Sequence, residues 1–285
     1  MTSPPATGRL LLGLVRATHA APAAVVTGLA ALLAAALGSG VPTTVLVTAA
    51  VGTGQLSIGW SNDWIDAERD RAVGRADKPV VAGLVTAPTL RACALAALAA
   101  CVVLSLATGL VPGLVHVVAV AGAWAYNAGL KATAWSWVPY AVSFSLMATF
   151  VVLAAPGDRV PAGWVVLAVA LLAVGAHVVN TLPDLDDDAA TGVRGLPHRL
   201  GRRASGVLAP ALLVAATAVV VAGPAGPPDA GAWVAGALAA VLALAAGACA
   251  VLRPRSRAPF ALSLGVAVLC VVVLGLSVGD VAVPR

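Results

Sequence analysis

The chain has 285 residues, of which 60% are hydrophobic and only 10% are charged, and its mean hydropathy is +0.98. A soluble domain of this length could not bury so many apolar side chains, so the composition indicates an integral membrane protein without a soluble domain. The net charge of +5 does not indicate a nucleic-acid partner, because the basic residues are scattered over short loops.

Apolar runs long enough to cross a membrane recur along nearly the whole chain. Each has about 20 residues, the length that a transmembrane helix needs. The runs show no alternation with period 2, so they match a barrel of transmembrane strands poorly and predict an all-α polytopic bundle. The nine predicted spans are residues 18–39, 42–61, 84–108, 111–130, 137–155, 161–182, 205–223, 229–251 and 259–278.

We expect residues 1–285 to form a single transmembrane domain, with residues 1–17 as a cytoplasmic tail. A cleaved signal peptide is the other interpretation of residues 9–30, since two arginines precede small residues there. A transmembrane span is favoured, because the apolar segment before those small residues, Leu10–Val15, is too short for the core of a signal peptide, and the run from Ala20 to Leu37 continues as a full span.

Basic residues are distributed unequally between the two sides of the predicted bundle. With the amino terminus inside, all Lys and Arg residues except Arg159 and Arg285 lie on one side. Such residues are enriched in cytoplasmic loops. We therefore expect a multi-pass protein of the cell membrane, with the amino terminus and the loops after spans two, four, six and eight in the cytoplasm. The carboxyl terminus is expected outside.

Nine of the twelve acidic residues lie in two of these cytoplasmic loops, within residues 63–77 and 184–188. Both loops contain the pattern Asn-x3-Asp-x3-Asp-x3-Gly followed by arginine, at the end of an even-numbered span. Its recurrence after 118 residues predicts an internal repeat. The repeated positions are Asn62, Asp66, Asp70, Gly74 and Arg75 in the first loop, and Asn180, Asp184, Asp188, Gly192 and Arg194 in the second.

The spacing within each pattern has a chemical consequence. Residues four apart share one face of a helix, so each pattern directs an amide and two carboxylates toward one point. Neighbouring carboxylates repel one another, and Mg²⁺ compensates for this while joining one or two carboxylates to phosphate oxygens. Arg and Lys residues interleave with the acids, which favours a phosphate group bridged by metal over a bare cation site.

Three segments resemble signatures of the UbiA-type intramembrane prenyltransferases. Residues 62–78 resemble the first signature, NDxxDxxxD, and residues 184–201 resemble the second. Residues 126–131 are similar to the Tyr/Lys element of a loop between them. The resemblance covers essentially the whole chain, including the nine helices and the cytoplasmic loops.

The resemblance implies transfer of a polyprenyl group from its diphosphate to an acceptor, often an aromatic ring, with Mg²⁺ as cofactor and membrane lipid around the protein. Metal and diphosphate binding are then assigned to Asn62, Asp66, Asp70, Asp184 and Asp188, with Asp63 as the next candidate. Phosphate contacts are assigned to Arg75, Lys78, Lys131 and Arg194, and a place facing the allylic cation to Tyr126. The catalytic residues would be Asp66, Asp70, Asp184, Asp188, Tyr126 and Lys131.

The sequence departs from the family pattern in two places. Tyr126 and Lys131 are five residues apart, where the family often has four. Pro183 precedes Asp184 and disfavours helical geometry in the residue before it, so we expect the sixth span to kink there.

Other residues near the second signature have no role in the pattern. His198 is expected at the surface, with a catalytic base as the alternative. His177 is expected to pack as a polar residue or to approach the acceptor. The roles of Asp186 and Asp187 stay open between metal and solvent contact.

Two other functions fit parts of the sequence. A UbiA-like enzyme could cyclise the prenyl chain or use a non-aromatic acceptor. A cation transporter could use the carboxylates as ion ligands. Transporters carry ionisable groups near the membrane midplane, however, and almost none lies within a predicted span here, so the prenyltransferase is the preferred prediction.

Overall fold

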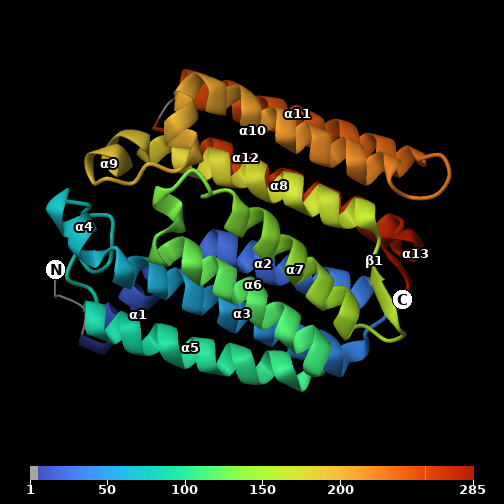
Figure 1. Cartoon of the computed structure of the whole chain (residues 1–285), viewed down its shortest axis with the longest axis horizontal. Helices are drawn as coiled ribbons and strands as arrows, with labels where there is room; N and C mark the ends of the chain where they lie inside the picture. Colours follow the sequence, from blue (N-terminus) through green and yellow to red (C-terminus); the bar gives the residue numbers. More distant parts are fainter. Residues whose placement is uncertain (1–5, 254) are drawn as a thin grey trace.

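Figure 1 shows a single bundle of long helices in the computed structural model, which describes residues 6–253 and 255–285. The short helices α4 and α9 lie at one end of the bundle, and the strand β1 lies at the other. The elements are α1 (Ala6–Ala17), α2 (Ala20–Ala36), α3 (Gly40–Ile65), α4 (Ala67–Ala72), α5 (Ala87–Ala107), α6 (Leu110–Ala128), η1 (Leu130–Ala132), α7 (Val138–Ala154), β1 (Arg159–Pro161), α8 (Gly163–Thr181), η2 (Leu182–Asp184), α9 (Leu185–Ala190), α10 (Leu196–Ala222), α11 (Ala230–Leu252), α12 (Ala258–Leu276), α13 (Val278–Val281) and β2 (Ala282–Pro284).

Seven helical segments in the described residues are long and apolar enough to cross a membrane, which confirms the all-helical membrane fold. They contain α3, α5, α6, α8, α10, α11 and α12. Helices α1 and α2 meet the same criterion together, but the chain bends by 63° between them, where His19 has a φ of 52°. Helix α7 is apolar but has 17 residues. The count of nine spans therefore stays a prediction, and α1 forms a helix where we expected a tail.

Side chains at the helix starts define several of these boundaries. Thr86 accepts a hydrogen bond from the Thr89 backbone N–H, and Pro88 occupies the first turn of α5. Asp229 accepts a hydrogen bond from the Ala232 backbone N–H at 2.7 Å, which caps α11 at the end of the bundle opposite α4 and α9 (Figure 1).

Small residues allow the helices to pack closely. A Cβ atom on Gly113 of α6 would lie 2.6 Å from the Leu106 Cα atom of α5, and one on Gly236 of α11 would lie 2.6 Å from the Val221 side chain of α10. Lipid tails are as apolar as the helices, so association in a membrane depends on such close packing. Glycine thus sets the helix spacing at these two contacts.

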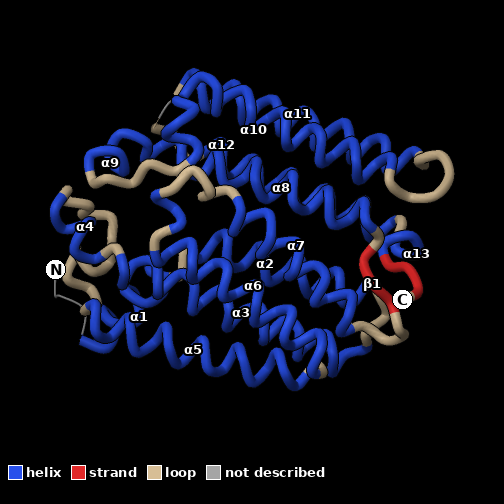
Figure 2. The backbone as a smooth tube through the Cα atoms, in the orientation of Figure 1, coloured by secondary structure: helices blue, strands red, loops and turns tan. Residues whose placement is uncertain are grey.

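A two-stranded antiparallel sheet joins the α7–α8 connection to the last residues of the chain (Figure 2). Arg159 pairs with Pro284, and the Arg285 backbone N–H donates to the Asp158 carbonyl oxygen at 3.0 Å. Arg159 and Arg285, which the charge pattern placed outside the cytoplasm, therefore lie together at this end. The orientation in the membrane itself stays a prediction.

Replacing Gly113 with alanine tests the close packing of α5 against α6. The new Cβ atom would lie 2.6 Å from backbone atoms of Ser105 and Leu106, so the helices must separate, and we expect a loss of about 1–3 kcal/mol. Gly28→Ala is the matched control, because its Cβ atom would meet nothing within 4 Å and alanine favours a helix. The measurement is the melting temperature in detergent, and equal values for the two variants would contradict the packing.

Candidate active site

Each acidic motif lies where a long helix is followed by a six-residue helix that ends two residues before a glycine. Helix α4 ends before Gly74, with a φ of 69°, and α9 ends before Gly192, with a φ of 83°. In each loop the residue after the glycine donates its backbone N–H to the backbone carbonyl oxygen of the last Asp of the motif. The distance is 3.0 Å for Asp70 and 2.9 Å for Asp188. Positive φ favours glycine, so the repeated glycines close similar turns. Descent of the two halves from one repeat stays a prediction.

The α-helix before the second motif ends close to Pro183, but Leu182, where we expected non-helical geometry, keeps helical dihedral angles (φ −55°, ψ −40°). Helix α8 ends at Thr181, and a 3₁₀ turn over Leu182–Asp184 connects it to α9. Asp184 therefore lies on a tight turn, whereas Asp188 lies on α9. Both carboxylates remain partly exposed, at 26% and 21%.

Asp66 is buried between α3 and α4 and has two cationic partners. The Lys131 ammonium donates to both carboxylate oxygens, at 2.5 and 2.6 Å, and the Arg69 guanidinium donates to one at 2.8 Å. Burial lowers the pKa of Lys131, whereas the carboxylates of Asp66 and Asp188 oppose this shift. Lys131, which the resemblance assigned to phosphate, thus neutralises Asp66 in this structure.

Asp63 is buried near the start of α2. Its Oδ1 atom accepts a hydrogen bond from the Lys78 ammonium at 2.7 Å and lies 3.4 Å from His19 Nε2, whereas Oδ2 is buried without a hydrogen-bond partner. Lys78 therefore contacts a carboxylate here. His19 is separated from Asp63 by 44 residues and no motif links the two, so their contact was not predictable from the sequence.

The asparagine of the first motif contacts a neighbouring helix. Asn62 donates to the Asn127 side-chain oxygen at 3.2 Å, and the Asn127 amide donates to Ser61 Oγ at 2.9 Å and to the Ile58 carbonyl at 3.0 Å. Asn127 is buried and joins α6 to α3, a role that the sequence did not reveal. The structure therefore holds Asn62 beside α6, and its binding of metal stays a prediction.

Arg75 links the two acidic loops. Its guanidinium donates two hydrogen bonds of 3.0 Å to Asp77, and its Nη1 atom lies 3.8 Å from Asp184 Oδ1 in the second loop. The hydrogen bonds to Asp77 raise the pKa of Arg75, and the same contacts lower the pKa of Asp77. The structure therefore brings together the two acidic loops, which the charge pattern predicted to lie on the same side of the membrane.

His198, near the start of α10, does not lie where we expected it. His198 was expected at the surface, which is wrong: its side chain is 6% exposed and its Nε2 atom lies 3.6 Å from Asp188 Oδ2. The start of α10 directs the imidazole inward, beneath the second loop. Arg194 is exposed and forms no ion pair with any described residue, so its phosphate contact stays a prediction. Asp186 is 78% exposed, and one oxygen lies 3.4 Å from Arg202.

Aromatic rings from three helices meet beside the acidic residues. The Tyr126 ring centroid lies 5.2 Å from that of Tyr140 and 5.7 Å from that of His177, and the last two are 4.5 Å apart. His177 is buried and lies 3.1 Å from Ser136 Oγ, which also accepts the Leu196 backbone N–H. This cluster forms a π-rich wall, suited to a delocalised cation or a planar ring.

The acidic side chains fit a metal that also binds substrate. No three acidic, His or Cys side chains in the described ranges converge closely enough to hold a metal ion by themselves. Mg²⁺ needs only one or two carboxylates when phosphate oxygens and water complete its shell. Two observations indicate unused ligand capacity: Asp63 Oδ2 lacks a partner, and Asp70 is buried without an ion pair among the described residues. Burial raises the pKa of Asp70 accordingly.

A double-mutant cycle in metal-free detergent tests the pairing of Asp66 with Lys131. Asp66→Asn or Lys131→Met alone should lower the free energy of unfolding by about 3–5 kcal/mol, because each leaves a buried charge without its main partner. The double variant should lose less than the sum, and additive losses would contradict a direct ion pair. Glu68→Gln removes an exposed acid nearby and should change stability by at most about 0.5 kcal/mol.

Several solved structures share this fold. The apo structure of a UbiA homolog from Aeropyrum pernix K1 has 22% identity and a TM-score of 0.71, with 90% of this chain and 97% of that chain covered. A UbiA homolog from Archaeoglobus fulgidus bound to DMAPP and Mg²⁺ has 15% identity and a TM-score of 0.70, with 94% and 99% covered. A digeranylgeranylglyceryl phosphate synthase has 19% identity and a TM-score of 0.64, with 97% and 99% covered.

A family match covers the residues that meet at this site. No curated protein sequence is significantly similar to this chain. Residues 24–269, however, match the UbiA prenyltransferase family, and this range contains both acidic loops and the aromatic cluster. This protein therefore belongs to the UbiA prenyltransferase family.

Proposed function

We propose that this protein transfers a prenyl group from a prenyl diphosphate to an acceptor, with Mg²⁺ as its cofactor. One observation carries the proposal: Arg75 of the first acidic loop lies 3.8 Å from Asp184 of the second, so a cation from one loop and a carboxylate from the other meet at one place. Membership of the family supports it. So do the Archaeoglobus fulgidus homologs, which are bound to DMAPP or GPP together with Mg²⁺.

The acidic residues would hold the metal, and the basic residues would hold the diphosphate. When bound, Mg²⁺ would supply positive charge that stabilises the leaving diphosphate. Lys131 pairs with Asp66 and Lys78 pairs with Asp63 in this structure. Each lysine would exchange its carboxylate partner for a phosphate oxygen when the substrate binds. The proposed metal ligands are Asn62, Asp63, Asp66, Asp70, Asp184 and Asp188, and the proposed phosphate contacts are Arg75, Lys78, Lys131 and Arg194.

The reaction breaks one bond and forms another. The bond between prenyl C1 and the diphosphate oxygen breaks, and its electron pair leaves with the diphosphate. The acceptor then supplies an electron pair to C1 and releases a proton. Tyr126, Tyr140 and His177 would present their rings to the allylic cation, and the surrounding apolar helices would exclude water.

We propose an aromatic acceptor, which the ring cluster would accommodate by stacking. The specific alternative is a non-aromatic acceptor, because one structural neighbour is a digeranylgeranylglyceryl phosphate synthase. Cyclisation of the prenyl chain without an acceptor is the other alternative.

Neutralising single carboxylates at the site tests the metal–diphosphate assignment. Asp70→Asn and Asp184→Asn should each slow Mg²⁺-dependent diphosphate release by about 100-fold or more, because each removes charge stabilisation from the leaving group. Asp229→Asn is the control, since Asp229 caps α11 at the far end of the bundle and should leave the rate nearly unchanged. A rate that survives both site substitutions, or that is insensitive to EDTA, would overturn the assignment.

The acceptor class can be read from products extracted into organic solvent. Purified protein with Mg²⁺ and a series of prenyl diphosphates should form prenylated product only when an aromatic acid or quinol is added. Prenylation of a glycerol phosphate acceptor alone would replace the aromatic proposal with the non-aromatic one. A cyclic hydrocarbon formed without any acceptor would show that the protein is a cyclase.

A further inference from the structure

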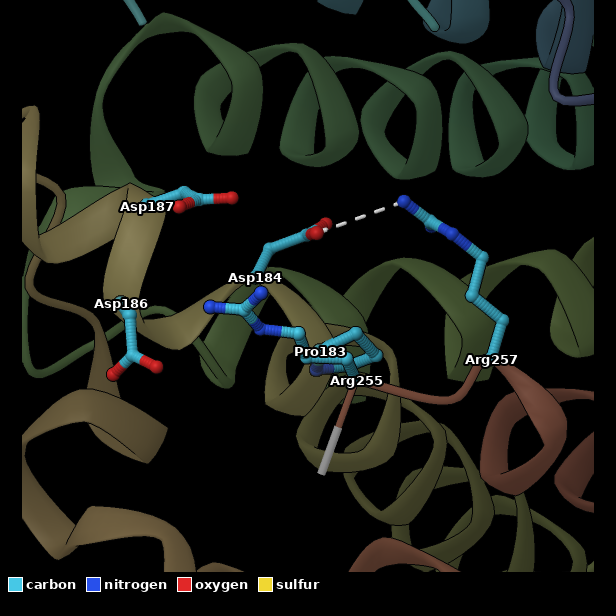
Figure 3. A pocket seen from close by; sticks show the side chains of 6 residues that line it. All are labelled: Pro183, Asp184, Asp186, Asp187, Arg255 and Arg257. Atoms are coloured by element: carbon cyan, nitrogen blue, oxygen red, sulfur yellow. Dashed lines mark ion pairs between the residues drawn. The ribbon is translucent and has the colours of Figure 1, made fainter. Parts of the chain in front are cut away.

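A third basic loop reaches the second acidic motif. The connection between α11 and α12 contains Arg253, Arg255 and Arg257, none of which belongs to the signatures that the sequence resembles. Figure 3 shows Arg255 and Arg257 extending from this connection toward the acidic residues. Six residues line a cavity of about 190 Å³ here: Pro183, Asp184, Asp186, Asp187, Arg255 and Arg257. A bulk water occupies roughly 30 Å³, so the cavity admits several waters or a small polar group.

Two arginines from opposite ends of the chain approach the same carboxylate oxygen. Arg257 Nη2 lies 3.6 Å from Asp184 Oδ1 (Figure 3), and Arg75 Nη1 lies 3.8 Å from that atom. Both distances exceed the usual hydrogen-bond length, so Asp184 attracts both guanidinium groups without a direct hydrogen bond to either. Asp184 is therefore flanked by cations that the first loop and the α11–α12 connection supply.

The Arg257 side chain is held only loosely. It is 62% exposed, so most of its five N–H donors remain free for another partner. An exposed ion pair of this kind contributes at most about 1 kcal/mol to stability, which is a weak structural reason for the contact. A guanidinium fork matches the oxygens of a phosphate group well and can donate two hydrogen bonds to it.

The balance of charge in the cavity indicates what it would bind. Three carboxylates face two guanidinium groups there, so neither a bare anion nor a bare cation matches the lining. A diphosphate accompanied by a divalent cation matches both, because the metal engages carboxylates while the phosphate oxygens engage arginines.

We infer that Arg255 and Arg257 bind the diphosphate group of the prenyl donor, so that the α11–α12 connection forms part of the donor site. This inference rests on the proposed function and adds binding residues to it. Arg257 would exchange Asp184 for phosphate oxygens, and Arg255 would contact the same group from the other side of the cavity. The two side chains would contribute to donor binding and to retention of the diphosphate product.

The test compares Arg257→Ala and Arg255→Ala with Arg253→Ala. Arg253 belongs to the same connection and is exposed, but it does not line the cavity, so it controls for the loss of one charge. The first readout is the Kd of inorganic diphosphate with excess Mg²⁺, measured by isothermal titration calorimetry on purified protein. We expect a roughly tenfold rise for each cavity arginine, as loss of one charged hydrogen bond gives, and no change for Arg253→Ala.

Steady-state kinetics supplies the second readout. Arg257→Ala should raise the KM for the prenyl diphosphate and leave the KM for the acceptor unchanged. The same Kd in all three variants as in the unmodified protein would overturn the inference and leave the proposed function standing. A KM effect confined to a phosphate-bearing acceptor would overturn the assignment to the donor. If the unmodified protein binds no diphosphate with Mg²⁺, the proposed function itself fails.

Discussion

Three carboxylates of the first acidic loop are buried, and a buried carboxylate costs several kcal/mol unless cations or hydrogen bonds compensate it. Asp63 and Asp66 are compensated both within this loop and from other parts of the chain. Lys78 and Arg69 belong to the same segment, whereas Lys131 comes from the connection after α6 and His19 from the bend between α1 and α2. This demand for compensating charge joins segments far apart in sequence at one end of the bundle, and the candidate site is where they meet.

The same pairs bear on how the proposed reaction would begin. Folding has already removed Lys131 and Lys78 from water, so a diphosphate that replaces their carboxylate partners meets cations that are desolvated and positioned. Preorganised charges of this kind stabilise a leaving group without reorganisation at the moment of reaction. Each carboxylate released by a lysine would become a free ligand for Mg²⁺, so binding of metal and of diphosphate would favour each other.

Local features of the site were predictable because local spacing determines them. The motif spacing and the glycine turns follow from helix geometry, and the break at Pro183 follows from the chemistry of proline. The convergence of both acidic loops at one end followed from the charge pattern of the spans. The spacing, the turns and the break each depend on residues that are near one another in sequence, whereas the convergence follows from how the basic residues are distributed over the whole chain.

Features that depend on helix rotation were not predictable. His198 points inward, and Asn127 bonds to α3, because of how α10 and α6 are turned about their axes, which no short motif records. The pairing of His19 with Asp63 depends on a bend at a residue with positive φ, in a run that reads as one continuous span. The same bend, together with the shortness of α7, separates nine apolar runs from seven helices long enough to cross a membrane.

The small sheet at the far end of the bundle has a consequence for the acidic end. Strand β1 leads directly into α8, and β2 follows α12 through the short α13, so the β1–β2 ladder fixes the axial register of α8 against α12. The two helices run back from the sheet with 19 residues each, a length of about 28 Å at 1.5 Å per residue. The two helices are therefore equally long. Asp184 follows the end of α8, and Arg257 precedes the start of α12. Backbone pairing at one end of the bundle therefore sets the axial position at which these two side chains meet near the opposite end.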